Sequence, residues 1–460
     1  MSRQQTRETD LGNDKIGGLL FKLALPAIMA QVINLLYNLV DRMYIGHINE
    51  VGPAALTGVG VTMPVIMAIS AFAALVSMGG APRASIMMGK GDREEAQRIL
   101  GNCASMLIIT AIVLTLAVQL FGREILLLFG ASDNTITYAW AYVQIYSLGT
   151  IFVQLALGLN AFINAQGYAQ IGMATVAIGA VCNIILDPVF IFGFHMGVQG
   201  AALATILSQA ISCIWILHFL TGRKPSLQLQ TRYMKLKAAT ILPCIGLGFA
   251  PFVMQFTESI LNICFNTSLL KYGGDIAVGA MTILGSVMQF SMLPIQGLTQ
   301  GAQPIIGFNY GARKMKRVKD CFKLTLVSCV LFTTIIWSIS MFAPQLFIGI
   351  FTADAQLMDF SKWAMRIYMA MSLIFGIQIA CQMTFTSLGK AVNSIIVAIV
   401  RKFVLVIPLI YILPNIFRAD QTNAVYMAEP VADILAVTFT AILFFFEFKK
   451  ALAEISDSQK

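Results

Sequence analysis

The chain has 460 residues, of which 58% are hydrophobic and only 12% are charged. A soluble globular chain carries about 25% charged residues, so this composition excludes an ordinary soluble protein and indicates a membrane protein. Lys and Arg number 31 against 22 Asp and Glu, a net charge of +9 that would suggest nucleic-acid binding in a soluble protein.

Apolar stretches long enough to cross a bilayer, which takes about 20 residues, recur along the whole chain. They lie at 20–46, 55–82, 98–121, 138–163, 170–194, 199–220, 240–270, 277–306, 323–347, 364–388, 392–414 and 422–448. We therefore predict an all-α membrane protein with twelve transmembrane helices. The polar start of the chain lacks the pattern of a signal peptide, so we expect the first span to be retained.

Basic residues are distributed unevenly between the two sides of the predicted membrane. They concentrate near both termini and in the loops around 83–98, 223–237 and 313–323, whereas the opposite loops hold only Arg123, Lys271, Lys362, Arg366 and Arg418. By the positive-inside rule, both termini are expected in the cytoplasm and the protein in the plasma membrane. The net positive charge is thus a topology signal, and we expect no nucleic-acid partner.

The two halves of the chain share landmarks at a separation of 222 residues. These pair Pro82 with Pro304, Gly89 with Gly311, Phe129 with Phe351, Tyr146 with Tyr368 and Gly167 with Gly389. Because each half contains an even number of spans, both enter the membrane from the same side, which predicts a parallel pseudo-two-fold repeat of two six-helix lobes. We expect an N-terminal lobe at 1–221 with the cation-coupling site, a cytoplasmic linker at 222–238 and a C-terminal lobe at 239–460.

Polar residues within the first and fifth spans are the strongest functional candidates. The first span carries Gln31, Asn34, Asn38 and Asp41 within an arc of roughly 80°, and we expect the three amides to contact substrate. The fifth span carries Asn183 and Asp187, followed by Pro188, which should kink the helix. Asp41 and Asp187 are expected at one depth, about 8 to 10 Å inside the outer boundary, where they can form one site.

Asn160 in the fourth span and Thr205 in the sixth add oxygen atoms to this N-terminal site. Two carboxylates with amide and hydroxyl oxygens suit either a shared proton or a sodium ion held by Asp41, Asn183 and Asp187. The sequence leaves both open. A structural alternative is that Asp41 pairs with the adjacent Arg42 and that the amides join helices.

The C-terminal half lacks this pair of acids, because Asn266 and Leu409 stand at the matching positions. Its seventh span places Gln255, Glu258 and Asn262 on one face, and its eighth carries Gln296 and Gln300. We expect these five residues to contact substrate, with Glu258 either facing a cation or making a simple hydrogen bond. Arg401 and Asp433 lie at comparable depth and are expected to form a structural ion pair.

Motifs for other chemistries are absent from the sequence. There is no GxxxxGK[ST] for nucleotide binding, and the three histidines, His47, His195 and His218, have neither HExxH nor metal-ligand spacing. We expect no enzyme activity and no cofactor.

Several segments resemble one known family. They are LLYNLVDRMYIGH around Asp41, NIILDP at 183–188 followed by IFGF, GAALAT at 200–205 and GAQPIIGFNYGA at 301–312. Over almost the whole chain they are similar to the multidrug and toxic compound extrusion (MATE) family, and NIILDP is similar to its DinF-like and MepA-like bacterial branch.

The resemblance implies a V-shaped pair of lobes and a monomeric antiporter that exports amphiphilic organic cations in exchange for protons or sodium ions. It places the ion site at Asp41, Asn183 and Asp187, with Asn160 and Thr205 beside it. The NorM-like branch also has a carboxylate pair in its C-terminal lobe, but here only Glu258 matches, because the tenth span has no acid. A flippase of a lipid-linked oligosaccharide or another amphiphile is the alternative function.

Overall fold

The computed structural model describes residues 9–48, 52–129, 131–352 and 354–457, and within these ranges the regular structure is entirely helical. The first half of the chain forms α1 (Ile16–Gly46), α2 (Gly52–Lys90), α3 (Arg93–Leu128), α4 (Ile136–Leu148), α5 (Thr150–Ala165), α6 (Ala169–Pro188), the π-helical η1 (Val189–Gly193) and α7 (Gly197–Thr221). The short η2 (Thr231–Tyr233) lies in the connection to the second half.

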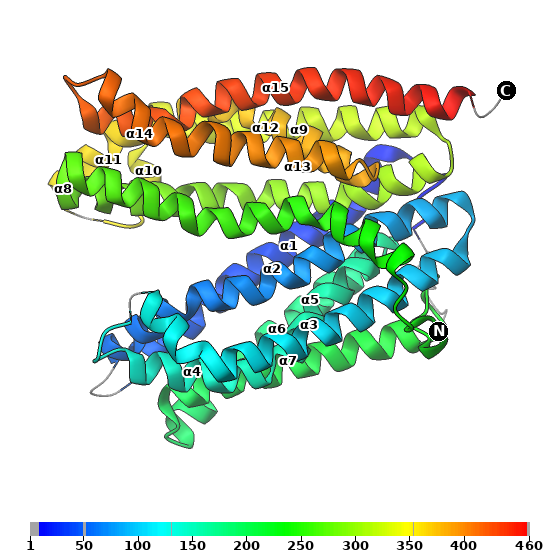
Figure 1. The fold of residues 1–460 in the computed structure, drawn as a ribbon, viewed down its shortest axis with the longest axis horizontal. Helices are drawn as coiled ribbons and strands as arrows, with labels where there is room; N and C mark the ends of the chain where they lie inside the picture. The colour runs from blue at the N-terminus through cyan, green and yellow to red at the C-terminus, as the bar shows by residue number, and fades with distance from the viewer. Residues whose placement is uncertain (1–8, 49–51, 130, 353, 458–460) are drawn as a thin grey trace, which may run out of the picture.

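The second half consists of α8 (Ala238–Gly311), α9 (Met315–Phe342), α10 (Gln345–Ile348), α11 (Ala355–Tyr368), α12 (Ser372–Ser387), α13 (Ala391–Ile399), the π-helical η3 (Val400–Val406), α14 (Ile407–Ile416) and α15 (Gln421–Asp457). The 74 residues of α8 are two spans rather than one, because Gly274 has φ 66° and ψ −166°, which breaks the helix. Figure 1 shows α8 crossing the molecule and returning.

The number of spans agrees with the sequence. In the described ranges, nine helices are long and apolar enough to cross a membrane, and up to 11 if each bent pair of helices is one span. Dividing α8 at Gly274 adds one more. The prediction of an all-α protein with twelve spans is therefore confirmed.

Two spans that the sequence predicted as single helices are sharply bent. The predicted span 138–163 consists of α4 and α5, which meet at 60°, and the predicted span 364–388 contains the junction of α11 and α12, which meet at 52°. A Cβ at Gly149, in the first bend, would overlap the Ile206 side chain. The second bend, around residue 371, stands 222 residues later, so the two lobes share this feature.

The helices form two lobes (Figure 1), α1 to α7 in one and α8 to α15 in the other. Each lobe has its own large apolar core, one around Leu107 and Phe162 and the other around Phe265 and Tyr426. The start of α1 and the end of α15 lie at the same end of the molecule, which we call the terminal end. From there the ribbons of the two lobes diverge toward the opposite end.

Glycines allow the lobes to approach closely near the terminal end. A Cβ at Gly89 of α2 would overlap the main chain at Phe308, and a Cβ at Gly311 of α8 would overlap the main chain at Ile86. Gly89 and Gly311 are repeat mates, and so are Ile86 and Phe308. The crossing of α2 with α8 is therefore symmetric, as a parallel pseudo-two-fold requires, and it depends on backbone contact that larger residues would prevent.

The segment before α1 also joins the lobes at the terminal end. Arg317 of α9 donates to the carbonyls of Leu11 (3.2 Å) and Asp14 (2.7 Å), and Lys314 donates to the carbonyl of Gly12 (2.8 Å). On the other lobe, the Thr9 hydroxyl donates to the carbonyl of Gly167. Residues 9–14 therefore tie the α5–α6 turn to α9.

Candidate functional site

Two acids meet inside the N-terminal lobe, as their predicted depth suggested. Asp41 lies near the end of α1 and Asp187 near the end of α6, and their carboxyl groups are close enough to interact. Asp187 has no solvent exposure, and Asp41 is half-buried. In each carboxylate one buried oxygen, Asp41 Oδ1 or Asp187 Oδ2, has no hydrogen-bond partner among the described residues.

Two asparagines extend this pair with further oxygen atoms. Asn183 Nδ2 donates to Asp187 Oδ1 at 3.1 Å and to Thr205 Oγ1 at 3.5 Å, and Asn160 Nδ2 donates to the carbonyl of Gly172 at 3.3 Å. With both amide groups turned this way, the Asn183 and Asn160 Oδ1 atoms are buried and receive no hydrogen bond from the described chain. We call Asp41, Asn160, Asn183, Asp187 and Thr205 the N-lobe acid site.

The N-lobe acid site borders a small cavity of about 50 Å³, lined among others by Asn34, Tyr37, Asn160, Asn183 and Thr205. A water molecule needs only about 10–15 Å³ measured in this way, so the cavity has room for an ion or a few waters. Its polar lining comes from α1, α5, α6 and α7, and α1 supplies it from the polar stripe that the sequence revealed.

Arg42 does not pair with Asp41. It is exposed, and its Nη2 lies 3.6 Å from the sulfur of Met63. No Lys or Arg forms a salt bridge with Asp41 or Asp187 in the described ranges. The two acids therefore share a site without a basic counter-ion.

The other two amides of the α1 stripe lie outside the cavity lining. Asn38 is exposed and donates to the carbonyl of Asn34 within its own helix at 2.7 Å, and Gln31 is half-buried. Pro188 ends α6, and the π-helical η1 continues the chain without a wide break, so the predicted kink takes the form of a local change in helix type.

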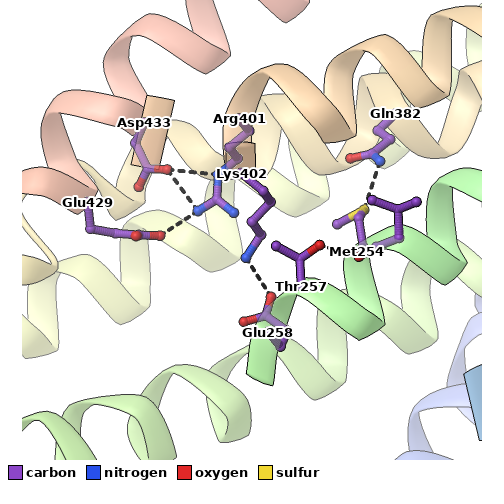
Figure 2. A network of polar contacts seen from close by, with 9 residues as sticks. Met254, Thr257, Glu258, Gln382, Arg401, Lys402, Glu429 and Asp433 are labelled. Carbon is purple, nitrogen blue, oxygen red and sulfur yellow. Dashed lines mark hydrogen bonds and ion pairs between the residues drawn. The ribbon is translucent and has the colours of Figure 1, made fainter. Parts of the chain in front are cut away.

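The acids of the C-terminal lobe have basic partners (Figure 2). Arg401 donates to Asp433 Oδ1 at 3.0 and 3.2 Å and to Glu429 Oε1 at 2.6 Å, and its guanidinium lies 4.3 Å from the centre of the Phe375 ring. The expected pairing of Arg401 with Asp433 is confirmed, and all three charged groups are buried.

Glu258 pairs with Lys402, whose Nζ lies 2.6 Å from Glu258 Oε1. The Lys402 side chain is 5% exposed and the Glu258 side chain 57% exposed. We call Glu258, Arg401, Lys402, Glu429 and Asp433 the C-lobe ion-pair cluster. Of the other predicted substrate contacts on α8, Gln255, Asn262 and Gln296 are exposed and Gln300 is half-buried.

Sequence reasoning missed three members of these sites. Glu429 lies one helical turn before Asp433, a spacing that places both on one face of a helix and that the sequence displayed. Lys402 was visible as a charge within a span, but its partner is 144 residues away. Tyr37 follows no polar pattern, and only the packing of α1 brings it to the cavity.

The donor set suits a proton or a hard cation better than a transition metal. The described ranges contain no group of three or more His, Cys, Asp or Glu side chains that could hold a metal ion. Asp41, Asn183 and Asp187 each offer a buried oxygen with free acceptor capacity. Oxygen ligands of this kind suit a transported sodium ion.

Comparisons with known proteins agree with this architecture. The family model MatE matches residues 26–189 and 251–412, one segment in each lobe. Among curated proteins, the multidrug export protein MepA of Staphylococcus haemolyticus is 25% identical over 415 residues, covering 90% of this chain and 91% of that protein. MepA of Staphylococcus aureus is 24% identical over 426 residues, covering 91% and 92%.

Solved structures share the fold over almost the full length. The MATE multidrug transporter DinF-BH, solved in complex with rhodamine 6G, is 32% identical with a TM-score of 0.86, covering 97% of this chain and 98% of that one. An outward-facing multidrug resistance MATE family transporter is 21% identical with a TM-score of 0.88 over 100% of both chains. The chain therefore belongs to the MatE family of membrane transporters.

Proposed function

We propose that the chain is a secondary active antiporter that exports amphiphilic organic cations in exchange for protons or sodium ions. The coupling ion binds at the N-lobe acid site, and the drug binds between the lobes. In this proposal, residues 1–221 carry the coupling site, 222–238 form a cytoplasmic linker and 239–460 form the second lobe. The protein works as a monomer, because one chain contains both lobes.

One observation carries the coupling site: four buried oxygens without a hydrogen-bond donor gather around two acids without a base. These are Asp41 Oδ1, Asn160 Oδ1, Asn183 Oδ1 and Asp187 Oδ2. Leaving buried polar atoms unsatisfied costs free energy, and two neighbouring carboxylates repel each other. A proton or a sodium ion relieves both penalties, so the empty site favours uptake of one positive charge.

Both ions fit the chemistry of the site. A proton on Asp41 or Asp187 lets one carboxyl donate to the other, which satisfies an acceptor and removes one negative charge. A sodium ion bridges carboxylate and amide oxygens from α1 and α6 and fills the adjoining cavity. In either case the ion draws α1 and α6 together, and we expect α1 to adjust at Pro26 and the other helix at Pro188.

The substrate class follows from the relatives and from the polar faces of two helices. The MepA proteins are named multidrug export proteins, and DinF-BH was solved with rhodamine 6G. Gln31, Asn34 and Asn38 on α1, with Gln255, Glu258, Asn262, Gln296 and Gln300 on α8, offer carbonyl and carboxylate oxygens to a cation. We place the terminal end in the cytoplasm, because the basic loops lie there.

The proposal is tested with purified protein in liposomes loaded with a fluorescent organic cation. A proton gradient and a sodium gradient are imposed separately, and dye movement is recorded for the native chain and for Asp41→Asn. We expect one gradient to drive transport by the native chain. The variant should lose nearly all of it while keeping the native melting temperature, because Asp41 stabilises no base.

Asp359→Asn is the matched control, since Asp359 is an exposed acid whose ion pair with Lys362 lies on the surface. It should transport at the native rate. Native transport rates for Asp41→Asn under both gradients would reject the coupling site.

A further inference from the structure

The polar face of α8 points toward the N-terminal lobe. A Cβ at Gly248 would overlap the main chain at Leu75 of α2, so this face of α8 contacts the other lobe. At about 100° per residue, Gln255, Glu258 and Asn262 lie within roughly 80° of Gly248 around the helix. They are exposed, and they lie beyond Gly248 in the direction in which the lobes diverge.

Within this stripe, Glu258 covers a charge that is itself almost inaccessible. Lys402 extends from η3 toward α8 and meets Glu258 at 2.6 Å (Figure 2). Its ammonium group has three donors, and Glu258 is its only hydrogen-bond partner among the described residues. The neighbouring Arg401, by contrast, has two buried acids of its own. Lys402 therefore depends on an acid that faces the space between the lobes.

This unequal exposure determines which ligand the pair accepts. A simple cation that takes Glu258 away leaves the buried Lys402 without a counter-ion, which is costly. A ligand with both a cationic group and a carboxylate avoids this cost. Its carboxylate replaces Glu258 on Lys402, and Glu258, which is half exposed, pairs with its cationic group. All four charges then keep an opposite partner.

An aromatic row runs beside the charged pair. Phe252 of α8 stacks on Phe256 at 5.9 Å between ring centres and contacts Phe72 of α2 at 5.1 Å. Since Phe72 and Phe252 belong to different lobes, this contact lies where the lobes diverge. Flat aromatic groups pack well against such rings, so a ligand with an aromatic body can contact the row while its charges reach Glu258 and Lys402.

We propose that Glu258 and Lys402 form a two-point site that selects aromatic zwitterions, with Lys402 binding the substrate carboxylate and Glu258 the cationic group. This proposal rests on the proposed export function and adds a preferred substrate class to it. Lys402 is thereby a specificity-determining residue, in addition to its role as the partner of Glu258.

The test compares two forms of one dye that differ only at a carboxyl group. Rhodamine 6G is an ethyl ester with a net positive charge, and its free acid is a zwitterion with the same chromophore. Binding of each is measured by fluorescence anisotropy on the purified full chain in lipid nanodiscs, without any ion gradient, with empty nanodiscs as the blank. The variants are Lys402→Met and Lys402→Arg.

We expect the native chain to bind the acid at least as tightly as the ester. In Lys402→Met the acid should bind about tenfold more weakly, because a charge-assisted contact is lost, while the ester should bind more tightly, because Glu258 no longer has a competing partner. Lys402→Arg keeps the positive charge and should restore the preference for the acid.

Equal weakening of both dyes in Lys402→Met, or no change in either, would overturn the inference and leave the pair a structural one. That result would leave the proposed export function intact, provided that the native chain binds the ester. A native chain that binds neither dye would count against both proposals. Since no gradient is used, failure of ion coupling at Asp41 does not affect the outcome.

Discussion

The N-lobe acid site and the C-lobe ion-pair cluster hold their acids in contrasting ways. Asp41 and Asp187 contact each other with no salt bridge to a base among the described residues, whereas Glu429 and Asp433 flank Arg401. A duplicated fold has thus produced one half that lacks a positive charge and one half that supplies its own.

This difference separates the two roles that a buried acid can have. An acid pair without a base gains free energy by binding an external cation, so it can couple to a gradient. An acid that already pairs with a buried arginine gains little from a second cation and would destabilise the protein if its partner were removed. Glu258 is intermediate, because its partner is buried but the acid itself is exposed.

The largest effect on stability is expected for Arg401→Met. It leaves Glu429 and Asp433 buried without a base, which should cost about 3–5 kcal/mol and lower the melting temperature of the purified protein. Adding Glu429→Gln and Asp433→Asn to this variant should recover part of the loss. Asp187→Asn in the other lobe is the comparison and should not lower the melting temperature, since Asp187 pairs with no base. Equal losses for Arg401→Met and Asp187→Asn would remove the contrast between the lobes.

The Glu258 and Lys402 pair should respond unequally to removal of its two members. Glu258→Gln leaves a buried ammonium unpaired and should cost about 1–3 kcal/mol. Lys402→Met leaves a half-exposed carboxylate that water can solvate, with an expected cost below about 1 kcal/mol. Thermal unfolding of both variants measures the difference. A greater loss for Lys402→Met would mean that Glu258 is the member that depends on the pair.

Asn183→Ala should weaken binding of the coupling ion by about tenfold, the equivalent of one hydrogen bond. It removes the donor to Asp187 Oδ1 and one of the unpaired oxygens. The ion concentration at half-maximal transport measures the change. Asn262→Ala, which removes an amide from the polar face of α8, should leave that concentration at its native value. An equal shift in both variants would argue that neither lobe alone binds the ion.

The smallest effect is expected for Arg42→Gln. Because Arg42 is exposed and lies toward Met63 rather than Asp41, its neutralisation should change gradient-driven dye transport by less than about twofold. A loss as large as that of Asp41→Asn would mean that Arg42 is the counter-ion of Asp41 during transport, and the N-lobe acid site would then resemble the C-lobe ion-pair cluster.

Much of the fold was accessible from the sequence, and part of each site was too. The span count, the shared depth of Asp41 and Asp187 and the pairing of Arg401 with Asp433 follow from hydropathy and helical rise, which depend on position along one helix. The bends between α4 and α5 and between α11 and α12 were missed, because Gly149 marks its bend only through the Ile206 side chain packed against it. The pairing of Lys402 with Glu258 was also missed, since periodicity does not specify which helices are neighbours.

The sequence by itself determined that the chain is a membrane protein with twelve spans in two repeated halves, because a bilayer imposes span length and apolar composition directly on the residues. It also determined which helix faces are polar. The tertiary structure decided which of those faces meet. Helix packing left Asp41 and Asp187 together without a base, and it brought Lys402 against Glu258 across 144 residues of chain. Charge compensation depends on distances between helices, and only the assembled lobes fix those distances.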